Sequence, residues 1–300
     1  MRVLRIRHLL LSLLLGAMVV LPSCRKEEEI IPSNKVRVGV PGRPGKIKGF
    51  FLLNEGNMGF NKATLDYYDY TTAFYTRNIY AERNPNVVKE LGDVGNDLQI
   101  YGNRLYAVIN VSHLIEVMDV RTAKHIGKIP IPNCRYITFK DGFAYVSSYA
   151  GPVKIDPNAR LGYVAKIDTA TLQVVAECPV GYQPDELVIS GDKLYVANSG
   201  GYRVPNYDKT ISVIDLKTFT EEKKVDVAIN LHRLELDNYG KIWASSRGDY
   251  YKVPSKIFVF DPKTEQVTKT LDVSCSNMTL SGDSLFVYST EWSYLTGENT

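Results

Sequence analysis

Cysteine and histidine are scarce in this sequence, with four of each among 300 residues. The cysteines after Cys24 are Cys134, Cys178 and Cys275, an odd number without C-x-x-C spacing, so neither a zinc ribbon nor a redox dithiol is expected. We expect small, half-buried thiols and at most one disulfide. The G-x-S-x-G, H-E-x-x-H and P-loop patterns are missing too. These absences argue against the commonest hydrolase, metalloprotease and nucleotide-binding signatures, and no metal site is expected.

An excess of charge of one sign is missing as well. The chain has 36 Lys and Arg residues against 33 Asp and Glu residues, and three of the cations, Arg2, Arg5 and Arg7, lie ahead of the first apolar segment. Without these three the two signs balance. No basic stripe follows later in the chain, so a nucleic acid is not expected as a partner.

Long apolar runs are limited to one segment near the N-terminus. It extends from Leu9 to Leu21, about 13 residues, which is too short for a stable bilayer-spanning helix but typical of a signal peptide. It ends at Leu21-Pro22-Ser23-Cys24, which resembles a lipobox, although Pro22 departs from the usual small residue. We predict a lipoprotein signal peptide over residues 1–24 with lipidation at Cys24. A plain secretory signal or an anchoring helix is the alternative.

The residues after Cys24 predict where the protein is sent. Arg25-Lys26-Glu27-Glu28-Glu29 resembles the export signal of lipoproteins in some Gram-negative gut anaerobes, which directs them to the outer face of the outer membrane. A solvated tether of mixed charge is the alternative. Residues 25–46 are rich in Pro, Gly and polar side chains and predict a flexible tether. We therefore expect a protein that is lipid-anchored in the outer membrane and exposed on the cell surface.

A repeat of roughly 46–50 residues runs through the rest of the chain. In each unit a short apolar strand ends in Asp, and the turn that follows has the form D-x-x-T, in which the Asp and Thr side chains can bond their own backbone. The repeated aspartates are Asp69, Asp119, Asp168, Asp215 and Asp261. Upstream of most of them lies a strand around an aromatic residue, preceded by a tight Gly or Asp hairpin. These aromatic residues are Tyr106, Tyr145, Tyr195, Trp243 and, in the last unit, Phe286.

Four short strands per unit, without a sustained helical period, predict an all-β protein. The expected architecture is a β-propeller of four-stranded blades over residues 47–300. The units are expected near 50–80 (first strand lacking), 96–131, 135–180, 185–227, 233–273 and from 277 on. Apolar positions that alternate along the strands are expected to form the core between blades; they include Ile100, Val108, Val117, Val146, Val188, Val196, Val213, Ile242 and Val259.

Three segments of the repeat resemble the YncE-type bacterial propellers. They are Leu194-Tyr195-Val196-Ala197-Asn198, Ile211-Ser212-Val213-Ile214-Asp215 and Pro179-Val180-Gly181-Tyr182-Gln183-Pro184. The opening Leu53-Asn54-Glu55-Gly56-Asn57 is similar to the start of a surface-lipoprotein branch that includes the BtuG-type vitamin B12-binding lipoproteins. The resemblance covers residues 47–300 and implies a seven-bladed fold. A chain with about five to six blades is then expected to be truncated.

The loops after the second strand of each unit are long and individual, whereas the D-x-x-T turns are short and uniform. In a propeller these two sets lie on opposite faces, and loop variation on a constant scaffold favours the first face as the place of function. Its Tyr, Trp and Arg side chains suit an amphipathic ligand. The predicted ligand-binding residues are Asn54, Glu55, Arg135, Tyr149, Asn198, Tyr202, Arg203, Tyr207, His232, Arg247, Tyr250, Tyr251 and Trp292.

The resemblance implies a corrinoid (vitamin B12) as the ligand, without any cofactor, and a TonB-dependent outer-membrane transporter as the protein partner. A propeller that binds a protein or a glycan without catalysis is the first alternative. A propeller lyase or a quinone-dependent dehydrogenase is the second, and it would need His113, His232 and Glu55 to cluster. His125 follows a turn on the opposite face, whereas His113 and His232 are better explained as hydrogen-bonded loop residues, and loop hydrogen bonding explains Glu55 equally well. No catalytic residues are therefore expected.

Overall fold

The computed structural model describes residues 31–87, 90–290, 292–293 and 298–299. The predicted signal peptide, Cys24 and the export signal lie outside the described residues and stay predictions. The chain divides into Met1–Ile31 and Pro32–Thr300, and everything below concerns the second unit. In the described part of the chain, no helix has both the length and the apolar character needed to cross a membrane.

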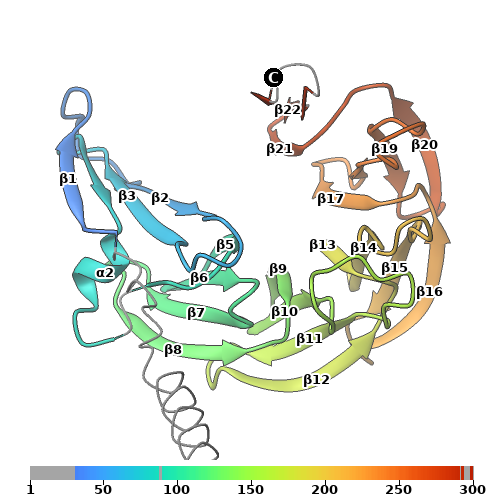
Figure 1. Cartoon of the computed structure of the whole chain (residues 1–300), viewed down its shortest axis with the longest axis horizontal. Coiled ribbons are helices and arrows are strands. Elements are labelled where there is room, and N and C mark those ends of the chain that lie inside the picture. The colour runs from blue at the N-terminus through green and yellow to red at the C-terminus, as the bar shows by residue number, and fades with distance from the viewer. Residues whose placement is uncertain (1–30, 88–89, 291, 294–297, 300) are drawn as a thin grey trace, which may run out of the picture. The chain divides into compact units, whose positions relative to one another are not determined.

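Five four-stranded antiparallel sheets make up most of this unit (Figure 1). We call them blades 1 to 5 in chain order; a sixth sheet has two strands, β21 and β22. The strands are β1 (Asn34–Arg37), β2 (Gly49–Asn54), β3 (Thr64–Asp69) and β4 (Phe74–Arg77) in blade 1; β5 (Gly95–Tyr101), β6 (Arg104–Ile109), β7 (Leu114–Asp119) and β8 (His125–Pro130) in blade 2; β9 (Cys134–Lys140), β10 (Phe143–Ser148), β11 (Tyr163–Asp168) and β12 (Gln173–Pro179) in blade 3; β13 (Pro184–Ser190), β14 (Lys193–Asn198), β15 (Thr210–Asp215) and β16 (Thr220–Asp226) in blade 4; β17 (Leu231–Leu236), β18 (Ile242–Ser246), β19 (Lys256–Asp261) and β20 (Gln266–Leu271) in blade 5; and then β21 (Asn277–Ser281), β22 (Ser284–Tyr288), β23 (Trp292–Ser293) and β24 (Glu298–Asn299). The predicted all-β fold of four-stranded blades is confirmed.

The D-x-x-T turns join the third and fourth strands of each blade for the expected reason. The Oδ1 atom of Asp119 accepts the backbone N–H groups of Arg121 at 3.0 Å and Thr122 at 2.9 Å. The same pair of hydrogen bonds is formed at Asp168 and Asp215. The side chain thus satisfies amides that the turn would otherwise leave unpaired, which is why the repeat is visible in the sequence.

Blade 1 departs from the other four. Its Asp69 turn joins β3 to β4, so β2 corresponds to the second strand of the other blades. Among the described residues no strand lies on its inner side, in agreement with the prediction. The outermost position is taken by β1, which pairs with β4 through Val36 opposite Tyr75. Residues 25–46 were predicted to be a flexible tether, and for Asn34–Arg37 that prediction is wrong. Their backbone pairs with the otherwise free edge of β4, so the sheet begins before residue 47.

Alternate side chains of each strand bury against the two neighbouring blades. In β14, Leu194 and Val196 pack with Tyr145 of blade 3, while Tyr195 packs with Leu231 of blade 5. This two-sided burial confirms the predicted core at Val108, Val117, Val146, Val196, Val213 and Ile242, all of which are fully buried. Val259 is buried and Val188 is half-buried. Ile100 is an exception: it is 57% exposed, because the space beside β5 is an open cavity rather than a packed interface.

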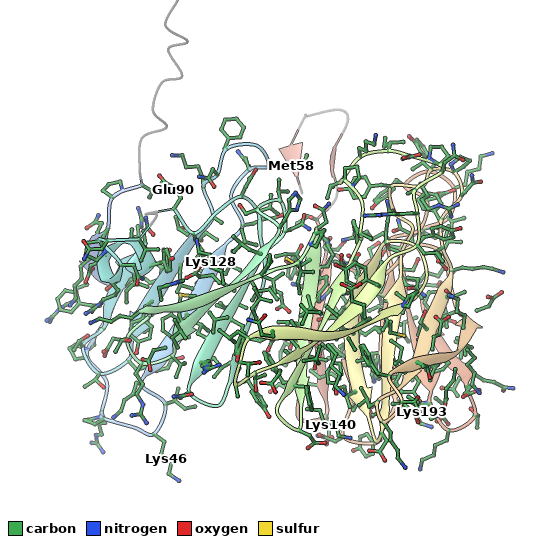
Figure 2. All side chains as sticks on the ribbon, turned by 90° about the horizontal axis from the view of Figure 1, so that it is seen from below. Lys46, Met58, Glu90, Lys128, Lys140 and Lys193 are labelled. Atoms are coloured by element: carbon green, nitrogen blue, oxygen red, sulfur yellow. The ribbon has the colours of Figure 1, made fainter. Side chains whose placement is uncertain are left out.

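The two kinds of connection lie at opposite ends of the blades (Figure 2). The hairpins between first and second strands, marked by Lys140 and Lys193, lie at one end together with Lys46. Met58, in the connection between β2 and β3, lies at the other end. We call the Met58 end the loop face and the Lys46 end the turn face. The one α-helix of the described residues, α2 (Ile79–Arg83), follows blade 1.

Candidate functional site

A buried carboxylate holds three blades together at the loop face. Asp185, near the start of β13, has no solvent exposure. Its Oδ1 atom accepts hydrogen bonds from Arg135 Nε at 3.0 Å and Tyr149 Oη at 2.9 Å. Its Oδ2 atom accepts from His232 Nδ1 and Arg247 Nη1, both at 3.1 Å. One acid therefore joins side chains of blades 3, 4 and 5, and we call these five residues the Asp185 cluster.

The charge state of the Asp185 cluster follows from its hydrogen bonds. Arg247 Nη2 donates to His232 Nε2 at 3.0 Å, so the imidazole carries its proton on Nδ1 and is neutral. Burial and the nearby guanidinium of Arg247 lower the pKa of His232 to about 3. Burial alone would raise the pKa of Asp185, but Arg135, the bond from His232 and Arg247 together hold that pKa well below its usual range. Two guanidinium groups share one carboxylate, and the cluster has a net positive charge.

A second set of ionic side chains lies one residue further along the inner strands. Glu186 accepts the backbone N–H of Leu234 at 2.7 Å and pairs with Arg233 Nε at 3.1 Å. Burial raises the pKa of Glu186 to about 8, against the lowering effect of Arg233 and with a further increase from the charge of Asp97. The Arg233 guanidinium lies 5.0 Å from the ring centre of Tyr136 on β9. Side chains of β9, β13 and β17 therefore contact one another, and their charged groups are paired within this set.

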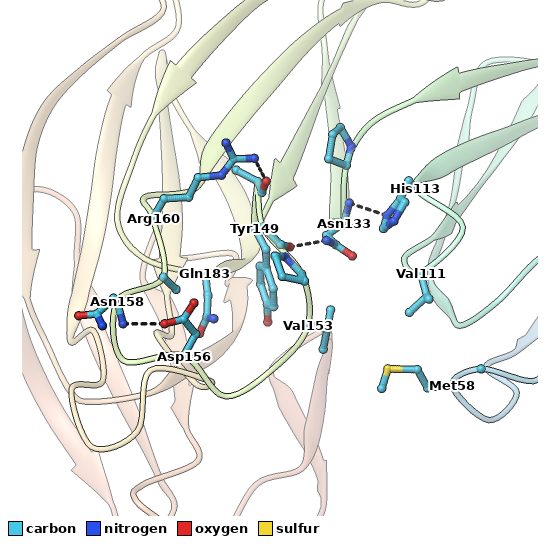
Figure 3. A pocket seen from close by; sticks show the side chains of 16 residues that line it. Met58, Val111, His113, Asn133, Tyr149, Val153, Asp156, Asn158, Arg160 and Gln183 are labelled. Atoms are coloured by element: carbon cyan, nitrogen blue, oxygen red, sulfur yellow. Dashed lines mark hydrogen bonds between the residues drawn. The ribbon is translucent and has the colours of Figure 1, made fainter.

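Above these clusters the loop face contains a cavity of about 760 Å³, shown in Figure 3. Its walls combine apolar groups with a few polar ones. The lining side chains include Met58, Val111, His113, Pro132, Asn133, Tyr149, Pro152, Val153, Asp156, Asn158, Arg160 and Gln183. We call it the loop-face cavity, and its composition is that of a small-molecule site.

Hydrogen bonds between loops fix the shape of this cavity. Asn133 donates its backbone N–H to His113 Nδ1 at 3.1 Å, which leaves the Nε2 atom of the neutral ring as a donor. Gln183 Oε1 accepts the N–H of Tyr202 at 2.7 Å, and Asp156 donates its N–H to the Tyr202 carbonyl at 2.8 Å. Arg160 donates to the Ala150 carbonyl within its own loop. The loops of blades 3 and 4 are thus tied together, and the cavity is preformed.

The structure divides the predicted ligand-binding residues into groups. Arg135, Tyr149, His232 and Arg247 come together, but around Asp185 rather than around open space. Of the predicted set, Tyr149 also lines the loop-face cavity. The sequence analysis predicted that each of the four contacts a ligand. Nothing in their spacing indicated that all four would instead bind one carboxylate.

Two predicted asparagines have structural roles. Asn198 is fully buried; its Oδ1 atom accepts the N–H of Gly181 at 3.1 Å and its Nδ2 atom donates to Thr210 and Ser212. A Cβ atom at Gly181 would lie 2.3 Å from the Asn198 side chain, so only a glycine at this position permits the contact. Asn54 likewise donates to Thr64 at 3.0 Å. Both asparagines hold the base of a loop rather than face a cavity.

The remaining predicted residues are spread over the loop face. Tyr202 is 38% exposed and meets Tyr149 edge to face, Arg203 stacks on Tyr182 at 3.5 Å, and Tyr207 lies 3.5 Å from the Asp249 carbonyl. Two others, Tyr250 and Tyr251, line a separate cavity of about 820 Å³ together with Arg247. Glu55 is exposed and lines neither cavity, and the side chain of Trp292 lies outside the described residues.

Residues that the sequence did not single out complete the loop-face cavity. Met58 and Val153 supply apolar surface, and Asn158 and Arg160 supply polar groups. Their loops were predicted to be functional, but which of their side chains point inward depends on the contacts between loops. His113 lines the cavity while His232 is buried in the Asp185 cluster. Among the described residues, no group of three or more His, Cys, Asp or Glu side chains is arranged to hold a metal ion.

The three described cysteines are buried and free. Burial raises the pKa of Cys134 to about 12, so this thiol stays protonated at neutral pH. Its equivalents in the repeat include Leu231, which is also fully buried. Cys134 therefore fills space between blades.

A family model covers most of the chain, matching residues 48–294. The chain belongs to the DUF5074 family, a domain of unknown function. No curated protein matches the sequence of this DUF5074 chain. The family assignment thus agrees with a repeat that extends over nearly the whole unit, and it names no ligand.

Solved structures similar to this DUF5074 chain agree with a β-propeller-like fold. Hydrazine synthase of Kuenenia stuttgartiensis matches with a TM-score of 0.51 and 20% identity, over 59% of this chain and 48% of that one. The computationally designed Ika8 protein matches with a TM-score of 0.51 and 14% identity, over 79% and 67%. A chain of the mitotic checkpoint complex matches with a TM-score of 0.55 and 13% identity, over 75% and 65%. The chain thus spans about half of the first, and these identities carry the fold alone.

Proposed function

We propose that this protein is a non-catalytic, surface-anchored binding protein that captures a corrinoid in the loop-face cavity for a TonB-dependent outer-membrane transporter. The observation that carries the proposal is the preformed cavity of about 760 Å³ with mainly apolar walls and few polar groups. The resemblance to YncE-type propellers and to BtuG-type lipoproteins supports the choice of ligand. The predicted lipid anchor supports the location.

The chemistry of the cavity suits a broad molecule with an apolar body and amide substituents. Val153 and Tyr149 offer apolar surface, while His113 Nε2 and the side chains of Asn158 and Arg160 offer hydrogen-bonding groups. The ionic groups beneath are already paired with one another, and the pKa of His232, about 3, makes it a poor base at neutral pH. Binding is therefore favoured over acid–base catalysis.

The test is calorimetric titration of cyanocobalamin into the full chain. We expect saturable binding of one equivalent. The variant Val153→Arg places a long charged side chain in the cavity and is expected to weaken binding at least roughly tenfold. The control is Ile155→Arg, because Ile155 belongs to the same loop, is 72% exposed and does not line the cavity. If both variants bind cyanocobalamin as tightly as the unchanged chain, the ligand binds outside this cavity. If the unchanged chain does not bind it, the proposal that the ligand is a corrinoid is wrong.

The cavity at Tyr250 and Tyr251 favours a glycan as a second candidate ligand. Tyr250 is 64% and Tyr251 87% exposed, and the same cavity is lined by hydroxyl groups of Ser255, Ser276 and Thr290. Exposed aromatic faces beside hydroxyl donors suit a sugar ring. Binding of an oligosaccharide that is lost in the double variant Tyr250→Ala/Tyr251→Ala but kept in Val153→Arg would support this alternative over the first.

A further inference from the structure

A second kind of cavity lies at the turn face, between blades 1 and 2. Its volume is about 1100 Å³. It is lined by β2, β3 and β4 of blade 1, by α2, by β5, and by the turn that contains Arg121. Lys46, which belongs to its rim, lies at the end of the blades opposite Met58 (Figure 2). We call it the turn-face cavity, and it is distinct from the proposed corrinoid site.

The floor of the turn-face cavity is apolar. Phe51 and Tyr67 of blade 1 form one side, with their ring centres 4.8 Å apart. Leu98 and Ile100 of β5 form the other. Ile100 is 57% exposed there, although apolar residues at the corresponding position of other blades, such as Ile189, pack against a neighbour. This apolar surface is therefore not covered by a neighbouring blade and is available to an apolar ligand.

The rim of the cavity has an excess of positive charge. Five cationic side chains line it: Lys35, Lys46, Lys48, Arg83 and Arg121. The one acidic residue of the lining, Asp69, uses its Oδ1 atom to accept the N–H groups of Thr71 and Thr72, at 2.8 and 2.9 Å.

Most of these cations have no anionic partner. Arg83 lies 3.5 Å from Glu82. Within the part of the chain that the structure describes, Lys35, Lys46 and Lys48 form no ion pair, and Arg121 acts on an acid only through its charge, which helps to lower the pKa of Asp119. Their side chains line the same cavity as the apolar residues, and no ion pair prevents them from binding an anion.

We propose that the turn-face cavity binds a free anionic amphiphile, with an unbranched apolar chain against Phe51, Leu98 and Ile100 and a carboxylate or sulfate head between Lys48 and Arg121. Apolar contact and charge recognition then act at opposite ends of one molecule. A polyanion without an apolar part would leave the floor exposed to water, and a neutral lipid would leave the cations without a partner. This activity is additional to the proposed capture of a corrinoid and uses the opposite face.

The experiment is calorimetric titration of the full chain with dodecanoate below its micelle concentration. We expect saturable binding of one equivalent. Each CH₂ group buried in the cavity is expected to strengthen binding about fourfold, so hexanoate should bind at least about a hundredfold more weakly. Dodecanol, which has the same chain without the charge, should bind at least about tenfold more weakly than dodecanoate. The proposal is wrong if dodecanoate does not bind saturably, or if dodecanoate, hexanoate and dodecanol bind with equal affinity. This test needs no variant of the protein.

Variants locate the site. Lys48→Glu/Arg121→Glu should weaken dodecanoate binding at least about tenfold. The control Lys217→Glu should not, because Lys217 occupies in the blade 4 turn the position that Arg121 occupies in the blade 2 turn, and it lies outside the cavity. Ile100→Asp should weaken dodecanoate more than hexanoate. Equal effects of the rim and control variants would overturn the site.

A second arm distinguishes a free amphiphile from a membrane surface. Vesicles of phosphatidylcholine with and without phosphatidylglycerol are floated with the chain and with its rim variant. Binding to anionic vesicles that the rim variant abolishes, without binding of monomeric dodecanoate, would overturn the proposal in favour of lipid headgroups. Cyanocobalamin titration of the same variants separates the two sites, because the rim variants should leave corrinoid binding unchanged whether or not dodecanoate binds.

Discussion

Asp185, which is not one of the predicted ligand-binding residues, connects four side chains of the loop face. Four side chains from blades 3 and 5 donate to its two oxygen atoms, and it has no solvent exposure. Taking a carboxylate out of water is costly, and this arrangement is stable because two guanidinium groups accompany it. The acid is therefore essential to its partners: without it, Arg135 and Arg247 would face each other as like charges in a largely buried site.

Asp185→Asn should lower the free energy of unfolding by roughly 3 kcal/mol, since it removes the charge while keeping a similar shape. The folded-state pKa of Asp185 lies below its unfolded value, so the ionised group stabilises the fold above about pH 4, and this contribution is lost as pH falls further. Urea unfolding at pH 6 to 7 measures the full effect. Asp192→Asn is the control, because Asp192 is 91% exposed in its pair with Lys140, and it should change stability by less than about 0.5 kcal/mol. Similar losses in both variants would contradict the role of Asp185.

At the scale of elements, blade 1 shows how a sheet is completed by a segment of unexpected origin. The first-strand position inside β2 is not occupied by a strand of the described residues, and β1 pairs instead with the outer edge of β4. All four residues of β1 are exposed, so its stability depends on backbone pairing and on contacts such as Lys35 over the ring of Phe74, at 4.7 Å. A strand of this kind leaves almost no hydrophobic signal in the sequence.

Val36→Pro should detach β1 from β4, because proline has no N–H group and does not fit a paired strand. Hydrogen–deuterium exchange is expected to show protection of Phe74–Arg77 reduced about tenfold, with blade 4 unchanged. Val40→Pro is the control: Val40 is 86% exposed and lies outside β1. Unchanged protection of β4 in the Val36 variant would show that β1 does not shield that edge.

At the scale of the whole molecule, the described unit has two faces with different chemistry. The loop face has a cavity with mixed walls above buried ion pairs, and the turn face has a cavity that combines apolar residues with an excess of cations, most of them without an ion-pair partner. Uniform D-x-x-T turns made the turn face look purely structural in the sequence. Its cavity arises where blade 1 differs from the other blades, so the repeat itself gives no indication of it.

The predicted anchor is tested on the whole chain. Cys24→Ser should abolish incorporation of radiolabelled palmitate and move the protein out of the membrane fraction, because the thiol is the predicted site of lipidation. Ser23→Ala keeps a small residue before the cysteine and should leave both properties intact. Labelling that persists without Cys24 would show that the lipobox-like segment is not used, and protease treatment of intact cells would then test surface exposure separately.

The sequence by itself determined the fold of this protein, because blade architecture is written locally. Alternating apolar residues, the aromatic second strand and the Asp turn each act within a few residues, and together they recur in blades 2 to 5. It also indicated the loops of the loop face, since these are the variable parts of a constant repeat. In both cases the physical cause lies close to the residues that reveal it.

Only the tertiary structure decided what the individual side chains do. Arg135, Asp185 and His232 belong to blades 3, 4 and 5 and are about 50 residues apart in sequence. Only the packing of the inner strands brings Arg135 Nε and His232 Nδ1 within 3.1 Å of the Asp185 carboxylate. Asn198 was predicted to contact a ligand, but its side-chain amide forms hydrogen bonds with Gly181 and Thr210 instead. Whether a polar side chain faces a ligand or a neighbour depends on contacts between blades, and such contacts are nonlocal, so no pattern within one repeat could reveal them.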